Sequence, residues 1–246
     1  CAFVEIVIYL KSNLNLMKMM KRIFLFTLGC MMCGIMKAQH LPLFDEYIQE
    51  AGDHAEMFSG KIESGYPSTM YLNSPYIPFD EFSTGDVMYN GLLYRKVLIR
   101  YDAYLKQLVV NTPVKHLNVS VPMSSVEKFT LDGKEYERRN GEMVAILFSS
   151  PRMELMEQVN ISVKEEMVTH ASLKYRFERD VKYYILQNGK THEVDKLKSV
   201  LKFYPDIKKE LRRFAKMHHL NFKEHRQSSL VSMIKYADEL LMKPLN

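Results

Sequence analysis

Three Asn-Gly or Asp-Gly dipeptides constrain the fold of this chain more than any other feature. They lie at residues 90–91, 132–133 and 188–189, and each stands between two short runs in which apolar and polar residues alternate. These dipeptides favour two-residue hairpin turns, because both turn residues must adopt positive φ. We therefore predict three antiparallel hairpins.

Further short apolar or alternating runs extend the same pattern between residues 83 and 195. Strands at a spacing of 8–12 residues with such turns are typical of all-antiparallel architectures. The sequence predicts an α+β fold that is mainly β, with an antiparallel meander, barrel or sandwich over 83–195. The additional predicted strands are 93–101, 108–111, 117–121, 143–148, 157–163 and 172–177.

The segments on either side of this β-rich body have a different pattern. Within residues 39–82 we predict a helix over 41–58, where apolar residues fall on one face, followed by a Pro-rich loop over 64–80. Residues 196–246 have helical periodicity and form a basic helical C-terminus, which we expect to pack on the same domain.

Three helices are predicted in this C-terminal segment. The first runs over 197–204, with Asp195 as its N-cap and Pro205 as its end. The second contains the apolar series from Ile207 to His218, and the third follows Ser228 or Ser229 as N-cap.

The first 38 residues have the pattern of a secretory signal peptide. A basic start at residues 19–22 precedes an uncharged apolar run over 23–36, which is too short to span a bilayer. We predict cleavage after Ala38, with residues 1–16 as upstream sequence or, alternatively, as a longer n-region. A second alternative is a lipoprotein anchored at Cys30, because residues 27–30 resemble a lipobox.

Removal of residues 1–38 changes the composition. All three Cys lie in that segment, so the mature chain has no thiol nucleophile or thiolate metal site. Its 208 residues carry 29 basic and 28 acidic side chains, a net charge of +1. We expect an exported protein of the periplasm or outer membrane surface, with no transmembrane helix after cleavage.

Charge is unevenly distributed along the mature chain. Residues 39–102 have a net charge of −6 and residues 196–246 a net charge of +7. One predicted helix carries a basic face that would suit an acidic envelope protein or anionic lipid head groups, whereas export argues against nucleic acid. The alternatives are a solvated helix face, or two charged ends that face each other. The basic residues are Lys208, Lys209, Arg212, Arg213 and Lys216.

No catalytic, metal or cofactor motif is present. His218, His219 and His225 lack zinc-ligand spacing, and we expect His218 to be half-buried on an apolar helix face. The nucleophile elbow G-x-S-x-G is absent. Arg100 and Asp102 form the one cluster that we single out for inspection, and a cross-strand ion pair is its simplest interpretation.

Several segments resemble a family of uncharacterised exported proteins of Gram-negative bacteria. They are residues 58–61, 73–76, 85–91, 97–104, 182–184 and 199–222. The likeness covers most of 45–240 and has no known catalytic residues, so it implies only export and a shared fold.

Together these features favour a non-enzymatic binding or accessory module of the cell envelope. The alternative is a cell-envelope hydrolase whose carboxylates or His residues are brought together only by folding. A deep pocket with convergent carboxylates or His would favour the hydrolase. The sequence specifies neither the ligand nor the oligomeric state.

Overall fold

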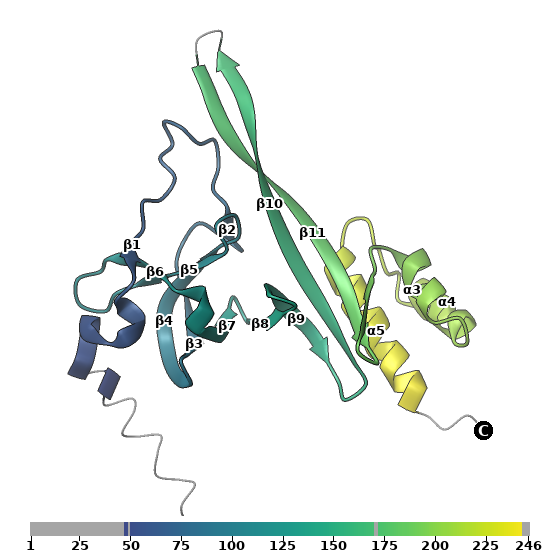
Figure 1. The fold of residues 1–246 in the computed structure, drawn as a ribbon. Helices are drawn as coiled ribbons and strands as arrows, with labels where there is room; N and C mark the ends of the chain where they lie inside the picture. The colour runs from purple at the N-terminus through teal and green to yellow at the C-terminus, as the bar shows by residue number, and fades with distance from the viewer. Residues whose placement is uncertain (1–46, 49, 170–171, 243–246) are drawn as a thin grey trace, which may run out of the picture. The chain divides into compact units, whose positions relative to one another are not determined.

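The computed structural model describes residues 47–48, 50–169 and 172–242 (Figure 1). The signal peptide, its cleavage site, Cys30 and the first part of the predicted helix over 41–58 lie outside the described residues. The prediction of a helix is wrong over residues 52–58. Gly52 has a φ of 49°, which ends helical geometry, and two 3-10 turns follow, η1 (Gly52–His54) and η2 (Glu56–Phe58).

Twelve strands of the described chain form one antiparallel sheet. Its order is β1-β6-β5-β4-β3-β7-β8-β9-β10-β11-β12, and β2 pairs with β4 beside this path. The end strands β1 and β12 do not pair with each other, so the sheet is open and the barrel alternative is excluded. The strands are β1 (Lys61–Ile62), β2 (Tyr76–Ile77), β3 (Ser83–Tyr89), β4 (Leu92–Asp102), β5 (Gln107–Asn111), β6 (Asn118–Val121), β7 (Val126–Leu131), β8 (Lys134–Arg139), β9 (Glu142–Ser149), β10 (Met153–Thr169), β11 (Ser172–Gln187) and β12 (Lys190–Glu193), and the 3-10 turn η3 (Met123–Ser125) precedes β7.

The three predicted hairpins are confirmed as β3–β4, β7–β8 and β11–β12. The two turn residues of each have positive φ, for example 49° at Asn90 and 75° at Gly91. A fourth turn of the same kind, at Asn140 and Gly141, joins β8 to β9. The sheet is therefore a meander over most of its length.

Strands β10 and β11 form a hairpin much longer than the sequence predicts. They pair continuously from Met153 opposite Gln187 to Thr169 opposite Ser172, with one irregularity near the tip. The sequence predicts only short strands within this stretch. The sequence misses the full length because most side chains between residues 161 and 168 are exposed, on both faces of the hairpin. The alternation of apolar and polar residues that marks a half-buried strand is therefore lost there.

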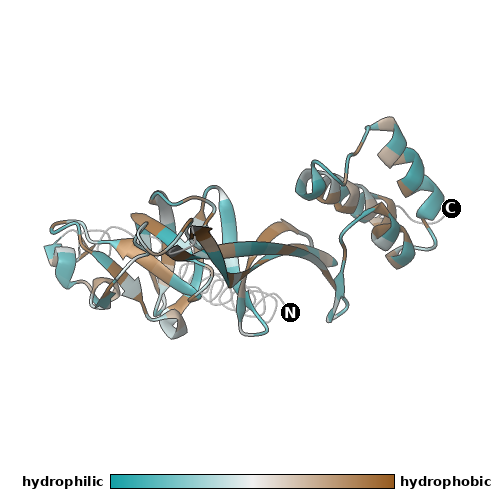
Figure 2. Cartoon of the chain, turned by 90° about the horizontal axis from the view of Figure 1, so that it is seen from above, coloured by the Kyte–Doolittle hydropathy of each residue, from teal (hydrophilic) through white to brown (hydrophobic). Residues whose placement is uncertain are grey.

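Three α-helices follow the sheet and confirm the predicted helical C-terminus. They are α3 (Leu197–Phe203), α4 (Lys208–Met217) and α5 (Arg226–Met242). Figure 2 shows both hydrophilic and hydrophobic residues along the helices. Two predicted N-caps are wrong. The N-cap of α3 is Lys196, the residue after Asp195, and the Ser199 hydroxyl accepts the backbone N–H groups of both residues. The helix α5 begins at Arg226, before Ser228 and Ser229.

The helices pack on one end of the long hairpin. Leu155 of β10 and Ile185 of β11 are fully buried in a cluster with Leu211 of α4 and with Leu230 and Met233 of α5. The body of the sheet has buried residues of its own, including Ile99 and the stacked rings of Phe129 and Tyr136.

Candidate functional site

The basic residues predicted on one helix lie on the outer face of α4. The opposite face anchors the helix, because Leu211 and Ala215 are buried and the ring of Phe214 stacks on Tyr236 of α5 at 4.1 Å. Within the described part of the chain, none of the five cations makes an ion pair or a side-chain hydrogen bond, although Glu210 lies on the same helix. The exposed cations are Lys208, Lys209, Arg212, Arg213 and Lys216.

The acidic residues between 50 and 102 do not neutralise this face. Among the described residues, no ion pair joins a carboxylate of that segment to a base of 196–242. These carboxylates instead accept hydrogen bonds nearby. Asp53, for example, accepts the backbone N–H groups of Val114 and Lys115 at 2.9 Å each. The two charged ends of the described chain therefore do not pair with each other.

Arg100 forms an ion pair, but not with Asp102. Its guanidinium donates to Glu63, a residue that follows β1, which is not a neighbour of β4. Both side chains of the pair are largely buried, at 14% and 9% exposure. The guanidinium carbon also lies 3.9 Å from the ring centroid of Tyr76 and 4.5 Å from that of Phe82. The pair is therefore enclosed by aromatic rings.

Asp102, at the end of β4, is only 2% exposed. One carboxylate oxygen accepts the backbone N–H groups of Tyr104 and Leu105 at 2.9 and 2.8 Å, and the other accepts the hydroxyl of Tyr66 at 2.6 Å. Burial raises the pKa of Asp102 above its usual value, and the nearby Glu63 adds to this, while the three hydrogen bonds oppose it. All three donors are neutral.

Asp102 and Glu63 line the same pocket, which has a volume of about 340 Å³. Tyr66, Tyr71 and Tyr104 form aromatic parts of its wall, and Gln107 and Ser120 contribute polar groups. Tyr76 donates its hydroxyl to Glu63 at 2.7 Å, so both oxygens of that carboxylate are also bonded. We call this the Asp102 pocket.

The Pro-rich loop predicted over 64–80 supplies much of this pocket and is fixed to β11. The Asn73 side chain donates to the carbonyl oxygen of Phe177 and accepts its N–H, both at 2.8 Å. The ring of Tyr71 stacks on Phe177 at 5.3 Å, and Arg179 donates to the carbonyl oxygen of Tyr76 at 2.9 Å. The long hairpin therefore supports the wall of the Asp102 pocket.

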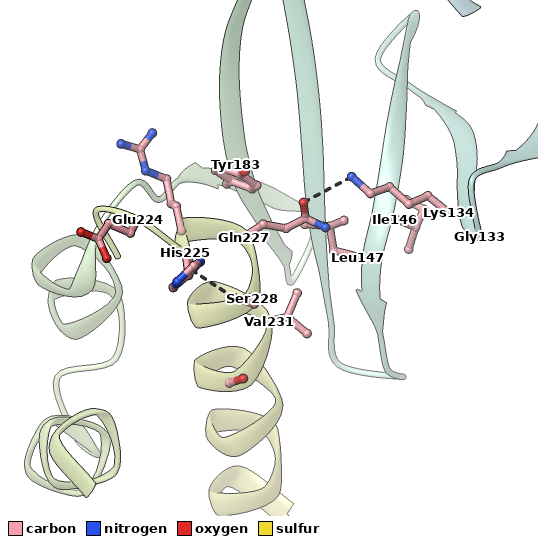
Figure 3. Close-up of a pocket in the computed structure, with 12 residues that line it drawn as sticks. Gly133, Lys134, Ile146, Leu147, Tyr183, Glu224, His225, Gln227, Ser228 and Val231 are labelled. Carbon is pink, nitrogen blue, oxygen red and sulfur yellow. Dashed lines mark hydrogen bonds between the residues drawn. The ribbon is translucent and has the colours of Figure 1, made fainter. Parts of the chain in front are cut away.

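A larger and more open pocket, of about 790 Å³, lies between the sheet and the start of α5 (Figure 3). Lys134 of β8 donates to Glu157 at 2.8 Å and to the side chain of Gln227 at 3.3 Å. Burial, together with Glu157, raises the pKa of Tyr183 to about 12. The bond from Lys134 to Gln227 ties α5 to the sheet.

The three His residues that we considered as metal ligands do not converge. All three are exposed, so the expected half-buried position of His218 is wrong; that residue ends α4, and its ring lies 4.3 Å from Phe214. No group of three or more His, Cys, Asp or Glu side chains within 47–48, 50–169 and 172–242 is arranged to hold a metal ion.

Comparison with known proteins identifies no family: no family model, curated protein or solved structure matches the chain. Over the residues that the structure describes, every helix lacks the combination of length and apolar sequence that a membrane crossing requires. The candidate sites therefore rest on geometry and charge alone.

Proposed function

We propose that this chain is an exported cell-envelope protein that acts as a binding or accessory module and docks through α4 on an acidic surface. The observation that carries this proposal is the row of five exposed cations without ion pairs in the described part of the chain. An anchored helix keeps such a row in a fixed geometry, and this favours recognition of a surface over simple solvation.

Anionic lipid head groups suit this face better than an acidic protein. Protein interfaces have an apolar, largely aromatic centre, whereas the exposed part of α4 offers only Met217, at 68% exposure, as a large apolar side chain. The apolar face of α4 is already used inside the protein. Contact with a membrane would therefore be electrostatic, without insertion of the helix.

The expected affinity is modest. Each Lys or Arg near an anionic membrane contributes about 1 kcal/mol, so five contribute about 5 kcal/mol, which corresponds to a dissociation constant on the order of 0.1 mM. Such binding weakens as salt is added, because exposed charges are screened. Stable attachment would need a second contact or several copies on one surface.

The test is co-sedimentation with vesicles that contain phosphatidylglycerol, with pure phosphatidylcholine vesicles as the uncharged reference. Replacement of Lys208, Arg212 and Lys216 by Gln should abolish binding to the anionic vesicles. The matched control replaces Arg95, Lys115 and Lys190 by Gln. These side chains are also exposed and lie elsewhere on the chain, so this variant should bind like the unmodified protein. Equal loss in both variants, or no binding to anionic vesicles, would contradict the proposal; retention of polyglutamate by the unmodified protein would then indicate an acidic protein partner.

A cell-envelope hydrolase is the second candidate, supported by the convergence of Glu63 and Asp102 on one pocket. We place it second because the oxygens of both carboxylates already accept hydrogen bonds from protein groups. Release of reducing sugar or free amine from cell-wall fragments, lost on replacement of Asp102 by Asn, would favour this candidate over the binding module.

A further inference from the structure

Among the described residues, no cation pairs with the buried carboxylate of Asp102. Its three hydrogen-bond donors are one hydroxyl and two backbone N–H groups. No ion pair of the described residues includes it. A buried charge is costly unless it is paired, so a carboxylate in this position lacks the partner that proteins ordinarily provide.

The nearest candidate for that partner is already engaged. Arg100 lies two residues before Asp102 on the same strand, but its guanidinium is directed to Glu63 and to the carbonyl oxygen of Asp80. Glu63 therefore has its own countercharge and Asp102 has none. Of the two carboxylates in the pocket, only Asp102 has an unbalanced negative charge.

Hydrogen-bond capacity is also left at this carboxylate. An ionised carboxyl group offers about four acceptor positions, and Asp102 uses three of them. The remaining position belongs to the oxygen that is bonded to Tyr66, a residue that lines the pocket together with Asp102. A ligand in the pocket could therefore bond directly to Asp102.

Part of the wall around this acceptor is aromatic. Tyr66 and Tyr71 meet edge to face at 5.1 Å, and Tyr104 lies at the rim, where its ring is 5.2 Å from Phe177. Aromatic ring faces attract cations, and several rings around one cavity are the usual means by which proteins bind quaternary ammonium groups. Lys61 also lines the pocket, but it is exposed and forms no ion pair with Asp102 among the described residues, so the buried carboxylate and the aromatic rings still favour a positive ligand.

We propose that the Asp102 pocket binds an organic ammonium group, which pairs with the Asp102 carboxylate and contacts the rings of Tyr66, Tyr71 and Tyr104. The volume of about 340 Å³ lies at the lower end of the range for small-molecule sites and suits a compact cation. A neutral sugar could use the same rings and acceptors, but it would leave the carboxylate unbalanced. This site is independent of the cationic face of α4.

The test is calorimetric titration of the full chain with choline and, separately, with dimethylbutanol, its neutral carbon isostere. Choline should bind at least about tenfold more tightly than the isostere, because only the cation gains from the carboxylate and the ring faces. Since this comparison uses the unmodified protein, its outcome does not depend on whether a variant folds. Equal affinity for the two compounds, or no binding of choline, would overturn the proposal.

Two variants then locate the binding site. Asp102→Asn should lower choline affinity at least about tenfold. Asp53→Asn removes a carboxylate that also accepts two backbone N–H groups but lies outside the pocket, and it should leave choline affinity unchanged. If Asp102→Asn keeps its choline affinity, or if glucose competes with choline in the unmodified protein, the proposal is wrong. The triple α4 variant should bind choline normally, which separates this result from the vesicle test.

Discussion

The acidic segment before residue 103 and the basic helix α4 use their charges in opposite ways. Glu63 and Asp102 are held inside the protein, where rings, backbone N–H groups and Arg100 surround them. The five cations of α4 point to solvent and pair with nothing in the described part of the chain. Charges of the first kind affect stability because they are desolvated, whereas charges of the second kind can be replaced without disturbing the fold and remain available to a partner.

The largest effect should come from breaking the enclosed ion pair. Glu63→Gln leaves the guanidinium of Arg100 largely buried without its countercharge and should lower the free energy of unfolding by about 3 kcal/mol. The control is Glu142→Gln, which breaks an exposed pair with Lys106 and should cost less than about 1 kcal/mol. Urea denaturation measures both. Similar losses in the two variants would remove the distinction between enclosed and exposed charge.

The loop that carries the pocket wall gives the next effect. Asn73→Ala removes both hydrogen bonds to the backbone of Phe177 and should lower the free energy of unfolding by about 1.5 kcal/mol. Asn73→Asp keeps the acceptor but loses the donor, so it should also be destabilising. A wild-type urea midpoint in both variants would mean that the loop is not fixed to β11 by this residue.

Asp102 and Asp53 should give pH effects of opposite sign. Burial raises the pKa of Asp102 in the folded state, so its contribution to stability is greatest at low pH and is lost as pH rises from the unfolded value of 3.8 through the folded pKa. Asp102→Asn should therefore stabilise the protein at neutral pH, by on the order of 1 kcal/mol, and this gain should shrink toward pH 4. The neighbouring side chains of Tyr66, Tyr76 and Glu63 are unchanged in this variant.

Burial also raises the pKa of Asp53, but the hydrogen bonds from the backbone N–H groups of Val114 and Lys115 outweigh this effect. The pKa of Asp53 is therefore below its usual value. Its stabilisation is present above pH 3.8 and is lost as pH falls through the folded pKa, so Asp53→Asn should be destabilising at neutral pH. Urea midpoints measured across pH 3–7 report both signs. Destabilisation of Asp102→Asn at neutral pH would mean that this carboxylate is structural and not held for a ligand.

The smallest stability effect should come from α4. The triple replacement of Lys208, Arg212 and Lys216 by Gln touches only exposed side chains, so the free energy of unfolding should change by no more than about 0.5 kcal/mol. A larger loss would show that these cations have a role in folding.

The two regions also differ in how far the sequence predicts them. The basic face of α4 depends on residues within ten positions of one another, so helical periodicity is enough to find it. The hairpins are local for the same reason, since the turn dipeptides at residues 90–91, 132–133 and 188–189 determine them. Short stretches of sequence are therefore sufficient to predict both features.

The Asp102 pocket could not be predicted in this way. It combines Glu63 and Tyr66 from the loop region with Asp102 from β4, while Phe177 of β11 supports its wall from more than 70 positions away. The sequence singles out Arg100 and Asp102, but their side-chain partners, Glu63 and Tyr66, come from the segment between β1 and β2. The spacing of residues along the chain contains no information on such contacts. The length of the β10–β11 hairpin could not be predicted either, because both of its faces are exposed near the tip.

The most direct test of the account is a comparison of lysine acetylation rates with and without phosphatidylglycerol vesicles. If α4 is the docking face, Lys208, Lys209 and Lys216 should be protected, while Lys115 and Lys190, which are also exposed, should react at unchanged rates. Added salt should remove the protection. Protection spread evenly over all five lysines, or confined to Lys115 and Lys190, would contradict the account.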